Sequence, residues 1–537
     1  MTESRTIDVG YGAIAVGFAA IVAYAISLAN GFAFDDVVLI PGDPRVTGAQ
    51  FGALLTQSYW HDSTLALYRP LTSLTFGLDW SLAKGAPAWF HFTNVLWHAL
   101  ASILAYRLLT RFFSPVAALC GALVFALHPV HVEAVANVVG RSELMAATFV
   151  LAACVVWTSR SLSLTARAVF AALCGGAAMF AKESAAVLPA LLLLLDYASG
   201  KVGRDYVRAN VRAFVPLVAV LVIFLAVRTA VVGAAPPARL DPSIEFASST
   251  SARVLTALQA WPIEFKLLFF PHPLLADYGP RILQPVNAWT PLAVLGLTLL
   301  VATLVGGIVA VVRGHRLAAL ALLWFPLTIL PVSNLLFPIG VLVAERTLYL
   351  PSFVVSIAVA AAVTYAVSPL RTFSPTPLRW LAVAMLVVLA ARTVTRIPDW
   401  RSTDSIMLAL VRDRPDAFRG QWHLARMARA RGDASAAVAR YDRALKLWPH
   451  REGLVQEAAA YGGSQGRSAW ARDVAAWGGT RWPNNINFHR MIASQAIDQG
   501  DTATARRAVL NGLRLDPNDQ LLNAMQRAFG AATTTVP

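Results

Sequence analysis

Long apolar runs separated by short loops dominate the first 393 residues of this 537-residue chain. A helix needs roughly 20 apolar residues to cross the hydrocarbon core of a bilayer, so the shorter runs must extend into flanking residues or tilt. Because 57% of the residues are hydrophobic and only 14% are charged, an ordinary soluble protein is excluded. We predict an all-α polytopic membrane protein with about eleven transmembrane helices, near residues 11–28, 92–110, 115–128, 144–158, 166–180, 185–197, 211–230, 291–312, 317–332, 350–368 and 378–393.

The loops between the predicted spans alternate in charge. If the N-terminus is cytoplasmic, the cytoplasmic loops are short and hold Arg107 and Arg111, Arg160 and Arg167, Lys201 to Arg212, Arg313 and Arg316, and Arg371 and Arg379. Short basic loops are typical of the cytoplasmic side. This orientation places two long loops outside, at about 30–91 and 231–290. The basic residues of these loops account for much of the net charge of +15. The chain lacks the basic-aromatic modules that would indicate a nucleic-acid partner.

A repeat follows the last apolar run. Its prolines are each 34 residues apart, which is the period of the TPR helix-turn-helix unit: Pro415, Pro449, Pro483 and Pro517. The first unit has the fullest TPR pattern, formed by Leu424, Ala425, Gly432, Asp433, Ala437, Tyr441, Ala444, Leu445 and Pro449. We predict a membrane domain at 1–393, a linker and capping helix at 394–414, and about three TPR units at 415–537. An odd number of spans places this repeat domain and its concave surface on the extracytoplasmic side.

Polar residues of the membrane domain gather in the predicted outer loops. They are Asp35, Asp36, Tyr68, Arg69, His128, His131, Glu133, Arg141, Lys182, Asn334, Glu345 and Arg346. A channel would be expected to carry ionisable residues along its spans. The distribution instead predicts an active site at the outer membrane surface, beside interfacial helical segments near 51–60 and 254–270.

An active site at the membrane surface suits a lipid-linked substrate, because the tail can stay in the bilayer while the head reaches the surface. If the head is a phosphosugar, transfer needs a carboxylate base for the acceptor hydroxyl and cations for the phosphate. Asp35 or Asp36 would be the base, and the phosphate would be bound by Arg346, Arg141 and Lys182. The remaining polar residues would orient these groups or contact the acceptor: His128, His131, Glu133, Glu345, Asn334, Tyr68 and Arg69.

Several of these assignments have structural alternatives. The Asp pair could be solvated loop acids, and Glu345-Arg346 could be an internal ion pair at a helix end. His128-x-x-His131-x-Glu133 contains metal-ligand residue types, but this spacing brings the three onto one helix face only partly. We therefore predict no metal site there, while a divalent cation held by one Asp stays an open alternative.

Six stretches resemble one known family, in the same order along the chain. They are Phe34-Asp35-Asp36, Tyr68 to Phe76, His91 to His98, His128 to Glu143, Lys182-Glu183, and Pro331 to Ser352. Together with the TPR units that follow, they are similar to the transmembrane and TPR repeat-containing O-mannosyltransferases. The resemblance implies a C-type glycosyltransferase fold, a polyprenyl-phosphate donor that usually carries mannose, and transfer to Ser or Thr hydroxyls of a protein. It also implies Asp35 as the base, because related enzymes with an acidic pair use its first member.

We therefore predict an inverting, polyprenyl-phosphate-sugar-dependent glycosyltransferase that resembles protein O-mannosyltransferases. Its partners would be the lipid-linked donor, membrane lipids and a protein acceptor recruited by the TPR domain, and no certain cofactor is expected. The chain resembles a bacterial member, which predicts a multi-pass inner-membrane protein with its active-site loops and TPR domain outside. The alternatives are a non-catalytic TPR scaffold for envelope assembly and a lipid-linked sugar flippase.

Overall fold

The computed structural model describes residues 9–61, 66–203, 205–233, 243, 249–366 and 375–533. Every regular element within these ranges is a helix, which confirms the all-α prediction. The chain divides into two units. The membrane unit comprises Met1–Tyr278 and Leu283–Ile406, and the C-terminal unit comprises Gly279–Ile282 and Met407–Pro537.

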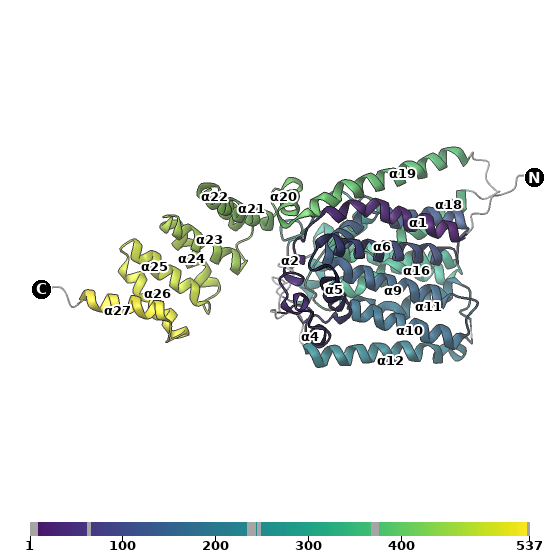
Figure 1. Ribbon diagram of the computed structural model, residues 1–537, viewed down its shortest axis with the longest axis horizontal. Helices are drawn as coiled ribbons and strands as arrows, with labels where there is room; N and C mark the ends of the chain where they lie inside the picture. Colours follow the sequence, from purple (N-terminus) through teal and green to yellow (C-terminus); the bar gives the residue numbers. More distant parts are fainter. Residues whose placement is uncertain are drawn as a thin grey trace, which may run out of the picture. The chain divides into compact units, whose positions relative to one another are not determined.

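All eleven segments predicted as spans contain a helix in the membrane unit. These helices are α1 (Val9–Tyr24), α6 (Pro87–Leu109), α7 (Pro115–Leu127), α9 (Arg141–Trp157), α10 (Leu164–Ala181), α11 (Leu188–Ala198), α12 (Tyr206–Val232), α16 (Pro291–Val312), α17 (Arg316–Ile329), α18 (Phe353–Ala366) and α19 (Pro375–Arg396). Figure 1 shows α1, α6, α9, α10 and α12 side by side. In this row α1 packs on α6, α6 on α9, α9 on α10, and α10 on α12.

Not all of these helices can cross a membrane by themselves. Within the described residues, six helices are long and apolar enough, and a bent pair, Pro115–Leu127 with Pro129–Ala136, would make a seventh. At about 1.5 Å per residue, the 11-residue α11 covers roughly half of a hydrocarbon core about 30 Å thick. The structure therefore supports a membrane protein with several apolar helices, and the count of eleven spans stays a prediction.

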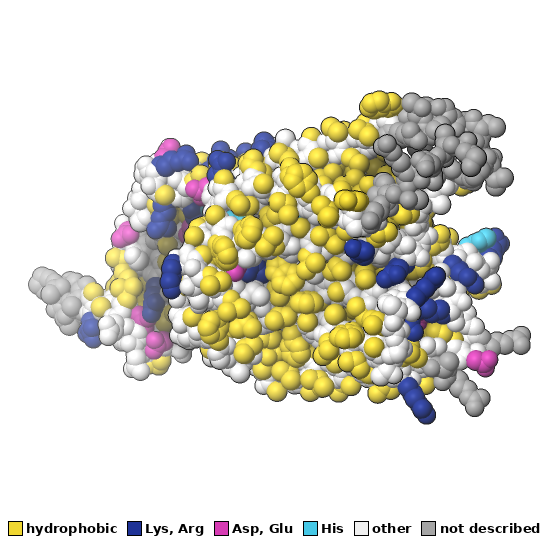
Figure 2. Space-filling view, turned by 45° about the vertical axis from the view of Figure 1, so that its right-hand side comes forward, with side chains coloured by type: hydrophobic (Ala, Val, Ile, Leu, Met, Phe, Trp, Pro, Cys, Tyr) yellow, Lys and Arg dark blue, Asp and Glu magenta, His cyan; other side chains and the backbone are white. Residues whose placement is uncertain are grey.

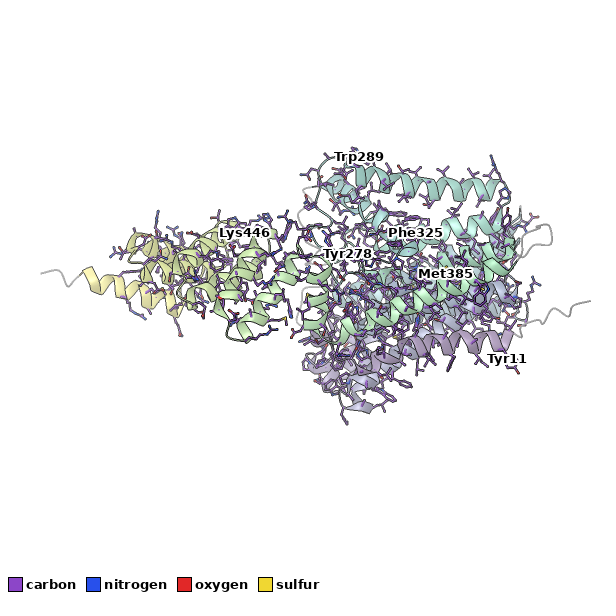
Figure 3. The ribbon with its side chains drawn as sticks, turned by 90° about the horizontal axis from the view of Figure 1, so that it is seen from above. Tyr11, Tyr278, Trp289, Phe325, Met385 and Lys446 are labelled. Carbon is purple, nitrogen blue, oxygen red and sulfur yellow. The ribbon has the colours of Figure 1, made fainter. Side chains whose placement is uncertain are left out.

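Hydrophobic side chains cover the outside of the membrane unit. Figure 2 shows them as a broad band, with Lys and Arg side chains on both the left and the right of this band in that view. On α12, the side chains of Val215, Val218 and Val222 are all exposed. Exposed Tyr11 and Trp289 lie at opposite ends of the unit (Figure 3), as aromatic residues do at the two membrane–water interfaces. Such an apolar surface is suited to lipid and would promote aggregation in water.

The first long loop contains more helix than the sequence predicts. It holds α2 (Asp36–Leu39), α3 (Pro44–Thr47), α4 (Phe51–Thr56) and α5 (Pro70–Ala83). A helix was expected near 51–60, whereas α5 was not, and α6 begins five residues before the predicted start of its span at residue 92. Polar residues interrupt the apolar pattern of α5, and Thr72, Ser73 and Asp79 are nevertheless buried.

The second long loop is described in part. Its predicted interfacial segment near 254–270 forms two helices, α14 (Thr250–Leu258) and α15 (Ala260–Phe269). Other parts of the predicted loops lie outside the described residues, among them Arg204, Arg371 and residues 234–242.

The C-terminal unit is built from helical hairpins. They are α21 (Phe418–Ala430) with α22 (Ala434–Leu447), α23 (Glu452–Ser464) with α24 (Ser468–Arg481), and α25 (Ile486–Asp498) with α26 (Thr502–Leu515), and α27 (Gln520–Thr533) follows. The three hairpins begin at the predicted spacing of 34 residues, since their first helices start at Phe418, Glu452 and Ile486. In each hairpin a glycine at φ between +71° and +76° makes the turn, where a side chain would be strained: Gly432, Gly466 and Gly500.

Candidate functional site

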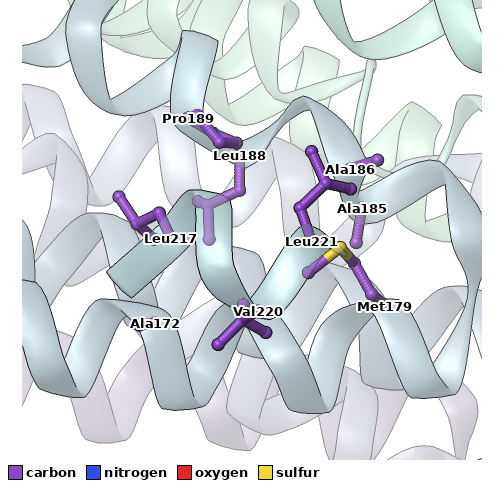
Figure 4. Close-up of a pocket in the computed structure, with 10 residues that line it drawn as sticks. Ala172, Met179, Ala185, Ala186, Leu188, Pro189, Leu217, Val220 and Leu221 are labelled. Atoms are coloured by element: carbon purple, nitrogen blue, oxygen red, sulfur yellow. The ribbon is translucent and has the colours of Figure 1, made fainter. Parts of the chain in front are cut away.

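Residues from distant parts of the membrane unit meet at one end of its helices. There α2 contacts η3 (Val138–Gly140), while α8 (Val132–Ala136) contacts η6 (Glu345–Leu348). Figure 1 shows α2 and α4 at this end, which we call the polar end. The unit also has a pocket between α10, α11 and α12, but apolar side chains line it, among them Met179, Leu188 and Leu221 (Figure 4). The candidate chemistry therefore lies at the polar end.

The acid pair lies in the turn that begins α2. Phe34 adopts a φ of +54°, a left-handed conformation that costs a non-glycine residue roughly 1–2 kcal/mol. Backbone contacts hold this turn in place, since Phe34 N donates to Thr403 Oγ1 at 2.9 Å and Gly31 N donates to Arg401 O at 2.9 Å. The two carboxylates then differ: Asp36 is fully buried, while the Asp35 side chain is 28% exposed.

Asp36 fastens this turn to η3. Its carboxylate accepts the backbone N–H groups of Ala33 at 3.2 Å, Val138 at 3.1 Å and Val139 at 2.8 Å. The Asn137 amide, oriented with its nitrogen toward the carboxylate, donates at 2.7 Å. Burial raises the pKa of Asp36 to about 7, although the backbone N–H groups oppose this shift. A carboxylate surrounded by donors is well placed to hold the loop and poorly placed to reach a substrate.

Asp35 instead faces a cation. Arg346 Nη2 lies 4.0 Å from Asp35 Oδ2. The same arginine is held by buried Glu133, which contacts its Nη1 and accepts its backbone N–H at 3.0 Å. The guanidinium thus lies between a buried carboxylate and a partly exposed one, so a substrate at Asp35 would meet both a proton acceptor and a positive charge.

A second group of charges lies nearby. Arg69 donates to both oxygens of Glu183, at 3.0 and 2.6 Å, while Lys182 pairs with Glu143. Burial acts to raise the pKa of Glu183, but Arg69 outweighs it and lowers that pKa to about 2. Tyr68, predicted as a possible ligand, donates its hydroxyl to Leu55 O at 2.7 Å and so anchors the loop.

Arg141 has a contact on each of its five N–H groups. Its partners, at 2.5 to 3.3 Å, are Asn94 Oδ1, Thr75 Oγ1, Asp79 Oδ2, Phe90 O and Thr93 Oγ1. These contacts join α5, α6 and α9, and they leave no N–H group for a phosphate. Asp79 was not predicted as a partner, although an acid in an otherwise apolar segment such as 70–83 is a signal for one.

The predicted histidine and acid cluster is divided among different partners. His128 Nε2 lies 2.9 Å from Leu268 O, His131 Nε2 lies 2.7 Å from Ser352 Oγ, and Glu133 binds Arg346. Within the ranges that the structure describes, no group of three His, Cys, Asp or Glu side chains is arranged to hold a metal ion. These residues therefore support the loops around Asp35.

Asn334 and Glu345 shape the loop that carries Arg346. Asn334, at a φ of +59°, donates to Val341 O at 2.8 Å and accepts from Ile339 N at 2.7 Å. Glu345 is buried, accepts from Tyr278 Oη at 3.0 Å, and contacts Leu275 N. Burial raises the pKa of Glu345 to about 8. Glu345 and Arg346 thus have different partners, so the alternative of an ion pair between these two residues is not what the structure has, and the internal ion pair of Arg346 is with Glu133.

Tyr59 is a residue of the site that the sequence did not indicate. It is 4% exposed, and the guanidinium carbon of Arg69 lies 5.2 Å from its ring centroid. Burial raises the pKa of Tyr59. The charges of Asp35 and Asp36 raise this pKa further, while Arg69 and Arg346 act to lower it, and each of these effects is smaller than that of burial. The phenol therefore lies near both groups of charges and keeps its proton.

Comparison with known proteins agrees with the predicted resemblance. No protein-family model matches the chain. The protein O-mannosyl-transferase F38B6.6 of Caenorhabditis elegans is 26% identical over 450 residues, which cover 80% of this chain and 62% of that protein. Mouse TMTC4 is 27% identical over 488 residues, covering 80% and 65%, and mouse TMTC3 is 28% identical over 458 residues, covering 77% and 48%. The chain thus spans less than two thirds of each of these relatives, and over most of its own length it is similar to proteins named protein O-mannosyl-transferases.

Proposed function

We propose that this protein is a membrane glycosyltransferase that moves a sugar, mannose, from a polyprenyl phosphate to a Ser or Thr hydroxyl of a protein. The observation that carries the proposal is the partly exposed Asp35 carboxylate, 4.0 Å from Arg346 and next to the buried, fully bonded Asp36. The similarity to protein O-mannosyl-transferases supports the same reaction.

In the proposed reaction, Asp35 takes the proton from the acceptor hydroxyl as its oxygen attacks the anomeric carbon. The bond from that carbon to the phosphate oxygen breaks, and the phosphate leaves with the electron pair. Attack opposite the leaving group inverts the anomeric centre. Arg346 would stabilise the charge that develops on the phosphate, and Glu133 would keep Arg346 in place.

The same proposal assigns a place to the rest of the chain. The membrane unit would have a C-type glycosyltransferase fold in a bacterial inner membrane, with its polar end outside and its basic end in the cytoplasm. The apolar surface of its helices suits a donor with a polyprenyl tail. The hairpins of the C-terminal unit, which repeat every 34 residues, would be TPR units that recruit the acceptor.

The test is a transfer assay with purified full-length protein, polyprenyl-phosphate mannose and acceptor peptides. We expect Asp35→Asn to lower the rate by roughly 10²–10⁴-fold, the usual contribution of a general base. Asp404→Asn, which changes an exposed carboxylate on α20 (Thr403–Asp413), is the matched control and should keep the rate. Normal transfer by Asp35→Asn would refute the base assignment, and donor translocation without a glycosylated product would favour a flippase.

A further inference from the structure

The hydroxyl of Tyr59 is a buried polar group without a partner in the described part of the chain. The backbone of the same residue is fully used, because Tyr59 N donates to Leu67 O at 2.8 Å and Tyr59 O accepts from Arg45 Nη2 at 3.2 Å. Leaving a buried hydroxyl unpaired is costly, and native structures rarely contain one without a reason. The fixed backbone and the unpaired hydroxyl together indicate a group that is held ready for a ligand.

The surroundings of Tyr59 favour an anionic ligand. The guanidinium carbon of Arg69 lies 5.2 Å from the centroid of its ring. Arg69 uses Nε and Nη2 to bind Glu183, and its Nη1 makes no hydrogen bond within the described residues. Arg346 also acts electrostatically on the phenol, and Asp35 and Asp36 act on it in the opposite sense. A neutral phenol beside these arginines offers N–H and O–H donors, which an anion such as phosphate accepts.

We propose that the Tyr59 hydroxyl, together with Nη1 of Arg69, binds the phosphate of the lipid-linked donor. This inference rests on the proposed function, and it extends the phosphate site beyond the residues that the sequence indicated. Of those residues, Arg141 has no N–H group left and Lys182 is paired with Glu143. Tyr59 therefore contributes a contact to the leaving group, and Asp35 contributes the contact to the acceptor.

The experiment measures binding of a short-chain polyprenyl monophosphate, which carries no sugar, to the full-length protein in nanodiscs. Tyr59→Phe removes one oxygen and keeps the ring against Arg69, so the variant should fold like the wild type. We expect its affinity for the polyprenyl monophosphate to be roughly tenfold lower, as for loss of a hydrogen bond to a charged group. In transfer assays, KM for the donor should rise more than kcat falls. A second arm titrates inorganic phosphate.

The matched control is Tyr197→Phe in α11, next to Asp196, because the Tyr197 hydroxyl donates to Val311 O at 2.8 Å, away from the polar end. Tyr197→Phe removes the same oxygen and should leave phosphate affinity unchanged. Equal affinity of Tyr59→Phe and the wild type, or no binding by the wild type, would overturn the inference. If Tyr59→Phe weakened the binding of inorganic phosphate as much as that of polyprenyl monophosphate, the assignment of the bound phosphate to a lipid-linked donor would be overturned. Tyr59-dependent binding without mannose transfer to any acceptor would support the phosphate contact and refute the proposed function.

Discussion

Each end of the membrane unit has a carboxylate near a basic side chain, and the two carboxylates differ in exposure and in hydrogen bonding. This difference distinguishes a carboxylate that holds helices together from the proposed catalytic base. At the end opposite the polar end, Asp196 is 2% exposed and accepts from Trp157 Nε1 at 2.9 Å, Lys201 Nζ at 2.8 Å and Tyr206 Oη at 2.7 Å. At the polar end, the Asp35 side chain is 28% exposed, and Arg346 Nη2 lies 4.0 Å from its Oδ2. Asp196 closes the junction of α9, α11 and α12, whereas the Asp35 side chain is partly exposed.

The comparison between Asp35 and Asp196 is most directly tested by replacing the basic side chain beside each carboxylate. Arg346→Met should lower kcat for transfer by roughly 10²–10³-fold, because it removes a charge that stabilises the departing phosphate. Lys201→Met is the matched change, and it should leave kcat unchanged, because the Lys201 ammonium is paired with the structural carboxylate of Asp196. Initial rates at saturating donor, measured on folded protein, check both variants.

Arg346→Met also leaves Glu133 without its partner, so the charge-keeping variant Arg346→Lys is needed beside it. We expect Arg346→Lys to recover folding and only part of the rate, since a lysine cannot contact Glu133 and the substrate in the same geometry. A loss of kcat in Lys201→Met as large as in Arg346→Met would show that the two ends do not differ in the way proposed.

The pH dependence of stability sharpens the contrast between Asp35 and Asp36. Burial raises the pKa of Asp36 from its ordinary value of 3.8 to about 7, so the folded state binds its proton more tightly than the unfolded state. The stability that this proton contributes is complete below about pH 4 and is lost as the pH rises through 7. It amounts to at most about 4 kcal/mol, from roughly 1.36 kcal/mol per pKa unit.

Asp36→Asn should therefore flatten the decline of the unfolding temperature between pH 4 and pH 8. Thermal unfolding of the detergent-solubilised protein at several pH values measures this slope. Asp35→Asn is the comparison variant, and it should change the slope less than Asp36→Asn does, because burial is the main cause of the raised Asp36 pKa and the Asp35 charge adds a smaller part. A wild-type slope that survives in Asp36→Asn would mean that Asp36 is ionised in the folded state at all of these pH values.

The sequence was sufficient to predict a helix in each of the eleven apolar segments and the loops that meet at the polar end, but not α2, α3 and α5. Apolar runs and a 34-residue repeat are local patterns, so they predict helices and hairpins directly. The acid pair and Arg346 were also identified, because polar residues after apolar runs must lie at the ends of the helices.

The division of roles among the charged residues was not predictable in the same way. Arg141 and Arg346 look alike in sequence, and only the folded chain shows that α5 brings Asp79 and Thr75 to Arg141. Tyr59 falls in the predicted interfacial segment near 51–60 but lies beyond the end of α4 at Thr56, and its importance comes from burial beside Arg69. Hydrogen-bond saturation and burial are properties of tertiary packing, so a single sequence does not reveal them.

The smallest expected effect concerns the Asp196 end. Asp196→Asn keeps the shape of the side chain but replaces one acceptor oxygen with a donor, so at least one of its three donors loses its acceptor. We expect the free energy of unfolding to fall by about 1–3 kcal/mol, and kcat per folded molecule to stay unchanged. Thermal unfolding and the transfer assay on the same preparation measure the two quantities separately.

Asp442→Asn in α22 is the control for Asp196→Asn, because Asp442 forms an exposed ion pair with Lys446 one helical turn away. Such surface pairs contribute only about 0.3–0.5 kcal/mol, so its unfolding temperature should barely change. If Asp196→Asn lowered kcat while its stability stayed at the wild-type value, Asp196 would take part in the chemistry. The proposed distinction between Asp196, a fully hydrogen-bonded carboxylate that holds helices together, and Asp35, an exposed carboxylate that reacts, would then be wrong.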